Sequence, residues 1–241
     1  MDQTTIVIVT SAYFTAAFLK GITGLGFSTI CLGLLAAVID LRLAIPLMLI
    51  PSLSSNVLVM VDAGNFRPAL TRFWPLFLAA LPAIGVGLWF LTHFDSSWGR
   101  SALGVVLLVY GLWGFWTRPL VLPSSWERRL RVPVGVVTGF VNGWTGSQVM
   151  PVLPFLMSLG LPRELFVQAI NISFTASTVV MAAGLWYSGL LDWSRIALSA
   201  FGVLPVAIGI WLGGKIRRRI PEALFRKLVM LLLIGLGVGL L

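Results

Sequence analysis

Charge is scarce in this sequence of 241 residues: Asp, Glu, Lys and Arg make up 10% of it, whereas 58% of the residues are hydrophobic. An ordinary soluble domain carries roughly a quarter charged residues. So few charges cannot cover a surface that faces water, which excludes a typical soluble globular domain. In lipid, each segment must satisfy its own backbone polar groups, so only helices and closed barrels remain.

The residues that most often carry catalysis or bind metals are also nearly absent. Cys31 is the one cysteine and His93 the one histidine, which excludes a disulfide framework and a His/Cys metal cluster. No HExxH motif, phosphate-binding loop or plausible Ser/His/Asp set is present. We therefore expect a protein that is not an enzyme and that has no metal or other cofactor.

Acidic residues are missing from the middle of every apolar run. All eight of them fall at the ends of runs or in the loops between: Asp2, Asp40, Asp62, Asp95, Glu127, Glu164, Asp192 and Glu222. The carboxylate of a typical proton relay or intramembrane cation site is therefore lacking.

Long apolar runs are what the sequence has instead, and its mean hydropathy is +0.99. The runs cover residues 5–38, 43–61, 73–91, 101–117, 132–158, 165–187, 193–213 and 224–241. They are continuous, whereas a membrane barrel shows short segments of alternating polarity. A helix needs about twenty residues to cross the hydrocarbon layer. The sequence therefore predicts an all-α, polytopic transmembrane protein.

Two of the runs, 5–38 and 132–158, are too long for one crossing and are broken by turn-forming residues. The breaking residues are Gly21, Gly24 and Gly26 in the first run, and Gly139, Gly143, Gly146, Pro151 and Pro154 in the second. We expect each run to form a hairpin-like pair of short helices that meet at an irregular turn inside the membrane.

The broken runs begin two similar halves. The segment 24–26 is echoed by 143–146, 52–56 by 171–177, and 81–85 by 204–209. The sequence thus predicts a first transmembrane repeat over 1–117, a basic linker over 118–131 and a second repeat over 132–241, all within one integral membrane domain. Repeats of this kind are typical of transporters.

The net charge of +9 predicts orientation in a membrane better than it predicts a nucleic-acid partner, because the basic residues flank apolar runs. If each broken run returns to its starting side, thirteen basic residues lie in the cytoplasm and three outside, with the linker inside and both termini outside. Each half then crosses an odd number of times, so the repeats are inverted. Inverted repeats with broken helices place a substrate site near the midplane.

Lys20 is the most informative candidate for a binding residue, because a cation inside an apolar run is costly and usually functional. Its neighbours Thr23, Gly24 and Gly26 offer backbone N–H groups at a helix start, where anions bind favourably. No acid balances this charge, which favours an anionic substrate. The alternative is that Lys20 caps a short helix and extends toward the surface.

Uncharged hydrogen-bonding residues gather at the second break, where an anion that has lost part of its water needs donors. The candidates there are Asn142, Gly143, Thr145, Gly146, Ser147 and Gln148, and the candidates for the walls of the site are Ser54, Asn56, Asn171, Ser173 and Thr175. The alternatives are that the first group satisfies backbone freed by the glycines, and that the second serves close helix packing.

These patterns resemble the sulfite exporter TauE/SafE family of bacterial and archaeal permeases. The resemblance rests on the glycine-rich breaks at 21–27 and 139–146, the segment 150–153, the Gly-Leu-Pro turn at 160–162 before a Ser/Asn-containing helix, and the Gly-x-x-Asp-Trp loop at 189–193. It covers nearly the whole chain. The first half departs from the pattern, with Asp-Leu-Arg at 40–42 in place of Gly-Leu-Pro and no Asp-Trp at 64–66.

The resemblance implies a multi-pass permease of the inner membrane that moves small sulfur-containing anions such as sulfite, sulfoacetate or other organosulfonates. Membrane lipid is then the other expected partner, and the oligomeric state stays open. Two other functions also stay open: a permease for metal ions or amino acids, and a membrane assembly factor that transports nothing.

Overall fold

The structure, a computed structural model, describes residues 3–23, 26–115, 121–217 and 222–241. These residues form eleven α-helices and no strand, which confirms the prediction of an all-α fold. The helices are α1 (Gln3–Thr23), α2 (Phe27–Ala36), α3 (Leu41–Ala63), α4 (Phe66–His93), α5 (Ser96–Phe115), α6 (Ser124–Thr145), α7 (Val152–Met157), α8 (Arg163–Tyr187), α9 (Trp193–Phe201), α10 (Val203–Arg217) and α11 (Glu222–Leu240).

Several helices are long and apolar enough to cross a membrane. In the described part of the chain these are Leu41–Val61, Phe66–His93, Ser96–Phe115, Arg163–Tyr187 and the combined segment Trp193–Ile216. Shorter apolar helices cover Ile6–Ile22, Phe27–Ala36 and Lys227–Leu240. The prediction of a polytopic helical membrane protein is confirmed.

Both long runs are broken where glycine permits a turn. In the first run α1 ends at Thr23 and α2 begins at Phe27, with Gly26 at a φ of 90°. In the second, α6 ends at Thr145, and Gly146 follows at a φ of 76°. Positive φ is readily adopted by glycine, which has no Cβ. The predicted breaks are therefore confirmed, while the return of each run to its starting side stays a prediction.

The structure differs from the sequence expectation in two segments. Residues 124–131, expected to belong to a polar linker, form the first two turns of α6. Glu127 in this segment accepts hydrogen bonds from Arg72 of α4 and Arg131 of α6. The apolar run 193–213 is two helices, α9 and α10, that meet at Gly202. A Cβ at Gly202 would lie 2.5 Å from the ring of Tyr13, so the close packing there requires glycine.

The chain divides into two compact units. Unit 1 comprises Met1–Pro51, Ser96–Trp116 and Leu190–Leu241, and unit 2 comprises Ser52–Asp95 and Thr117–Gly189. Each unit thus combines segments of both predicted repeats, and helix α3 passes from one unit to the other at Pro51. The division into repeats over 1–117 and 132–241 stays a prediction.

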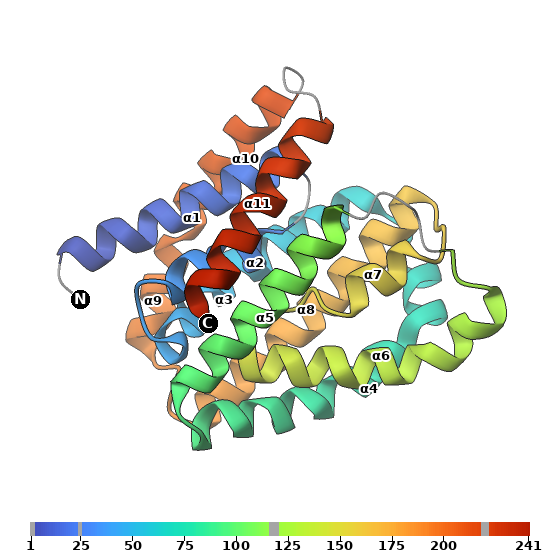
Figure 1. Ribbon diagram of the computed structural model, residues 1–241, viewed down its shortest axis with the longest axis horizontal. Coiled ribbons are helices and arrows are strands. Elements are labelled where there is room, and N and C mark those ends of the chain that lie inside the picture. The colour runs from blue at the N-terminus through green and yellow to red at the C-terminus, as the bar shows by residue number, and fades with distance from the viewer. Residues whose placement is uncertain (1–2, 24–25, 116–120, 218–221) are drawn as a thin grey trace. The chain divides into compact units, whose positions relative to one another are not determined.

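Unit 1 is built on the helix pairs α1–α10 and α5–α11, which lie side by side in Figure 1. A hydrogen-bond network fastens α3 and α9 to them. The hydroxyls of Tyr13 and Ser199 both donate to the carbonyl of Leu47, each at 2.6 Å, and the Ile50 N–H donates to Ser199 Oγ at 3.1 Å. The bonds to Leu47 satisfy the carbonyl that loses its helical partner because Pro51, four residues later, has no N–H.

Unit 2 is built on the pair α4–α6, which run alongside each other (Figure 1), with α8 packed against α4. Glycines on α6 allow the two backbones to approach closely. A Cβ built on Gly139 would lie 2.1 Å from the Ala80 carbonyl oxygen, and one on Gly143 would lie 2.2 Å from that of Ile84. Small residues at an interface are how membrane helices pack tightly.

The same contact occurs in each unit. In unit 1, a Cβ on Gly21 would clash with the Ile210 carbonyl oxygen, and one on Gly213 with that of Phe18. In unit 2, a Cβ on Gly143 would clash with the Ile84 carbonyl oxygen, and one on Gly87 with that of Phe140. Phe, Gly, Ile and Gly thus meet in the same way in α1–α10 and in α6–α4, the pattern that an internal duplication produces. In this register Gly21 corresponds to Gly143, so the sequence Lys-Gly-Ile-Thr-Gly at 20–24 is repeated as Asn-Gly-Trp-Thr-Gly at 142–146.

Candidate functional site

The break after α6 is shaped by Thr145 and Gly146. The Thr145 hydroxyl donates to the Val141 carbonyl at 2.7 Å and accepts from the Ser147 N–H at 3.1 Å. The Gly146 N–H donates to the Asn142 carbonyl at 2.7 Å. Thr145 is therefore used to close the end of the helix, and the side chains of Asn142, Ser147 and Gln148 are left for other partners.

Three polar side chains at this break are buried with unpaired atoms. Asn142, Ser147 and Gln148 are only 1%, 0% and 4% exposed. Asn142 Nδ2 and Oδ1, Ser147 Oγ and Gln148 Oε1 have no hydrogen-bond partner among the residues that the structure describes. Leaving a buried polar group unpaired costs about 1–3 kcal/mol, so such groups are rare and call for an explanation. These atoms are able to pair with a polar ligand, and their role in binding stays a prediction.

Gln148 is held in place by Thr178 of α8. The Gln148 side-chain amide donates to Thr178 Oγ1 at 2.9 Å, and the Thr178 hydroxyl donates to the Phe174 carbonyl at 2.8 Å. Thr178 is 2% exposed. Sequence reasoning did not single out this threonine, because nothing in the sequence shows that α8 lies against the break. The one available signal was its place at the end of the Ser/Thr-rich stretch of α8.

The break of the first run, in unit 1, carries a charge instead of amides. Lys20 lies in the last turn of α1 and is 6% exposed, a position where the helix dipole favours a cation. On α2, Thr29 is 1% exposed and its hydroxyl lacks a partner in the described chain. Gly26 immediately precedes α2, whereas Gly24 and the side chain of Thr23 lie outside the described residues.

The predicted wall residues, all in unit 2, differ in what they are free to bind. Asn56 is 2% exposed, and its Nδ2 has no partner in the described structure. Asn171 donates to the Val167 carbonyl at 2.8 Å, and the Thr175 hydroxyl faces the sulfur of Met60 at 3.9 Å. Ser173 is buried and Ser54 half-buried. Of this set, Asn56 thus offers an unpaired buried donor, whereas Asn171 and Thr175 are engaged with their own unit.

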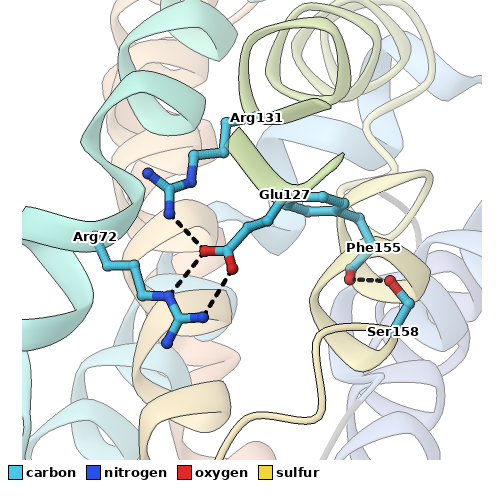
Figure 2. Close-up of polar contacts among 5 residues, drawn as sticks. All are labelled: Arg72, Glu127, Arg131, Phe155 and Ser158. Carbon is cyan, nitrogen blue, oxygen red and sulfur yellow. Dashed lines mark hydrogen bonds and ion pairs between the residues drawn. The ribbon is translucent and has the colours of Figure 1, made fainter. Parts of the chain in front are cut away.

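An ion-pair cluster joins α4 and α6 in unit 2, as Figure 2 shows. Arg72 donates twice to the Glu127 carboxylate, both bonds at 2.8 Å, and Arg131 donates once. The hydrogen bond from Arg72 is the main reason that the pKa of Glu127 falls to about 2. This carboxylate stays ionised at neutral pH, and we assign it a structural role. The contact also places Arg72 and Arg131 at the same end of unit 2.

A metal site finds no support in the described residues, where no three His, Cys, Asp or Glu side chains lie close enough to hold an ion. The polar groups at the break of α6 are the amides of Asn142 and Gln148, the Ser147 hydroxyl and the Trp144 indole N–H, and the N–H and O–H groups among them suit hydrogen bonding to an oxyanion.

Comparison with known proteins gives one match, to a protein-family model that spans nearly the whole chain. No curated protein and no solved structure matches it significantly. The family model described as "Sulfite exporter TauE/SafE" matches residues 9–240, nearly the whole length. A match of that extent includes the break in each of the two long runs and every candidate site residue. The chain therefore belongs to the sulfite exporter TauE/SafE family, a family of membrane permeases.

Proposed function

We propose that this chain is a secondary transporter that exports small sulfur-containing anions, such as sulfite, sulfoacetate or another organosulfonate, across the bacterial inner membrane. Membership of the family implies membrane export of a sulfur anion. The observation that carries the proposal is the set of buried, unpaired polar atoms of Asn142, Ser147 and Gln148 at the break of an apolar run.

These groups suit a small oxyanion. The Asn142 amide and the Ser147 hydroxyl can each donate hydrogen bonds to a ligand, and Asn56 offers a further unpaired N–H in the same unit. In a site that excludes water, hydrogen bonds to an anion are stronger than in solvent. Several neutral donors therefore replace part of the water that a sulfite or sulfonate group loses, without binding it too tightly for release.

Lys20 supplies the positive charge in this proposal. It occupies the position in 20–24 that Asn142 occupies in 142–146, and it is buried in an apolar helix. A buried cation is costly in a membrane protein unless its charge is used. Its equivalence to Asn142 and its burial support Lys20 as the source of positive charge for the anion.

Transport proceeds, in this proposal, by alternating access, with rocking of one half of the chain against the other. Helix α3 connects the two compact units and contains Pro46 and Pro51, and the boundary between the units falls directly after Pro51. Proline removes a backbone hydrogen bond and weakens the helix there, which makes this segment the first candidate for a hinge. Pro82 and Pro205 are further candidates.

The test is a substrate panel with purified protein in liposomes. We expect saturable flux of sulfite and of small sulfonates, measured with a fluorescent or radioactive reporter inside the vesicles. Zinc ions and a neutral amino acid serve as the competing solute classes. Flux of zinc or of the amino acid without sulfur-anion flux would replace the proposal by a different permease. No flux at all from folded, inserted protein would favour an assembly factor.

A further inference from the structure

The orientation of the Gln148 amide is determined by its partner. A threonine hydroxyl has one proton to donate, and that of Thr178 goes to the Phe174 carbonyl at 2.8 Å. Toward Gln148 the Thr178 oxygen is therefore an acceptor, and the Gln148 Nε2 donates to it at 2.9 Å. In this series of hydrogen bonds, each donor meets an acceptor only if it runs from the Gln148 nitrogen through the Thr178 hydroxyl to the Phe174 carbonyl. Thr178 thus turns the nitrogen of the amide toward α8.

The carbonyl oxygen of Gln148 is consequently left without a donor. Gln148 is 4% exposed, and Oε1 has no partner in the part of the chain that the structure describes. A carbonyl oxygen only accepts hydrogen bonds, and so do the oxygens of a fully deprotonated sulfite or of a simple sulfonate. A ligand of that kind leaves Oε1 unsatisfied and brings negative charge toward it.

We propose that Gln148 makes the site selective for sulfur oxyanions that carry their own hydrogen-bond donor. These are the protonated, singly charged form of sulfite and sulfonates with a hydroxyl or amino group. This inference rests on the proposed transport of sulfur anions and specifies which of them fit. Asn142 and Ser147 donate to the oxygens of the ligand, and Oε1 of Gln148 accepts its O–H or N–H.

The charges of the second break agree with this selection. The sequence holds no basic residue between Arg131 and Arg163, so the polar groups of the break itself are neutral. Burying an ion among neutral groups becomes more costly as its charge rises. A monoanion is therefore favoured over a dianion. If sulfite crosses in its protonated form, each anion brings a proton with it, and no carboxylate relay is needed.

The decisive experiment compares 2-hydroxyethanesulfonate with ethanesulfonate as substrates of the wild-type protein in liposomes. Both are monoanions at every working pH, so the hydroxyl is the difference under test. We expect the flux of the hydroxylated compound at low concentration to exceed that of ethanesulfonate by at least about tenfold. Ethanesulfonate has no hydroxyl, so it leaves the buried Gln148 oxygen unpaired. Equal flux of the two would overturn the proposal and leave sulfur-anion transport standing.

Two variants test whether the preference for the hydroxylated compound depends on the Gln148 carbonyl oxygen. Gln148→Met removes the acceptor at similar volume, and Thr178→Val removes the group that orients it, so both should reduce the preference for the hydroxylated compound to about twofold or less. Gln168→Met is the matched control, since the Gln168 amide, once turned so that its nitrogen faces acceptors, donates to the carbonyls of Met60 and Gly64 at 3.0 and 2.8 Å. A preference retained in both folded variants would overturn the assignment to Gln148.

The pH dependence of sulfite flux is a second test of the proposal. We expect its wild-type flux, measured against total sulfite, to rise as the pH falls through the second pKa of sulfurous acid, and this rise to be weaker in Gln148→Met. The opposite pH dependence would contradict the proposal. Absence of flux for sulfite and for both sulfonates would instead reject the proposed function itself, so the two failures are distinguishable.

Discussion

At the scale of single residues, the two breaks show one motif that carries two different chemistries. Lys20 and Asn142 hold the same position before Gly-x-Thr-Gly, and both are buried. The first contributes a charge and the second an amide. Farther along the same break, Ser147 and Gln148 stand where the first half has Leu25 and Gly26. The second half therefore carries the uncharged hydrogen-bonding groups.

The sequence identifies these candidates only in part. Asn142, Ser147 and Gln148 follow from their place among glycines in an apolar run, and the structure shows that they are buried and unpaired. Thr178 does not follow, because its contact with Gln148 depends on how α8 packs. The correspondence of Lys20 with Asn142 was missed as well, since closely spaced glycines allow more than one alignment of the halves.

Replacing Asn142 with aspartate should strongly reduce anion flux. The change keeps the size of the side chain but places a negative charge where donors are needed. Charged hydrogen bonds are worth about 1.5–3 kcal/mol, so a loss of roughly ten- to a hundredfold in initial flux is expected. Asn65→Asp, the same change at an exposed left-handed turn residue, is the control. Equal flux in the two variants would exclude Asn142 from the site.

Glu127 makes the stability of unit 2 depend on pH. Its pKa is lowered from 4.5 to about 2 by Arg72 and Arg131, so the folded state binds this proton less readily than the unfolded state does. The stabilisation is therefore complete above about pH 5 and is lost as the pH falls from there toward 2. Because solvent at Arg72 screens the ion pair, we expect ionised Glu127 to stabilise the folded state by about 1 kcal/mol.

Thermal unfolding in detergent checks this expectation. Glu127→Gln should lower the melting temperature at pH 7 and should differ less from the wild type at pH 3.5. A variant as stable as the wild type at pH 7 would show that the ion-pair cluster contributes nothing.

At the scale of helices, the pattern of apolar runs predicts most of the fold. Runs 43–61 and 165–187 correspond to α3 and α8 with ends shifted by at most two residues, and run 73–91 corresponds to α4, which begins seven residues earlier, at Phe66. The early start of α6 was not predicted, because its first turns are polar, and their ion pair with α4 depends on tertiary packing that the sequence does not show. Nor did the apolar run 193–213 reveal its interruption at Gly202.

Glycine at the α4–α6 contact should be irreplaceable. A Cβ on Gly139 would lie 2.1 Å from the Ala80 carbonyl oxygen. A Cβ on Gly85 of α4 would have no other atom within 4 Å. Gly139→Ala should destabilise the protein by about 1–3 kcal/mol, as overpacking does, and lower the yield of monodisperse protein in size-exclusion chromatography. Gly85→Ala should elute as the wild type does. Normal behaviour of both variants would mean that α4 and α6 are not closely packed.

At the scale of the whole molecule, the distribution of basic residues predicts the orientation. The residues around Arg129 should face the cytoplasm and Arg100 the outside. Cys31 is 0% exposed and should remain unlabelled, so single cysteines can be added to the wild-type chain. In intact cells a membrane-impermeant maleimide should label Arg100→Cys and reach Arg129→Cys only after lysis. The reverse pattern would contradict the predicted orientation.

The central claim is that buried polar groups at the two breaks bind a sulfur anion during transport. Its most direct test is sulfite flux into liposomes that contain wild-type protein, Lys20→Ala or Asn142→Ala, with folding and insertion verified for each. The account predicts saturable flux for the wild type and a loss of at least about tenfold in either variant, as removal of a buried hydrogen-bonding partner implies. Wild-type flux that both variants retain in full would contradict it.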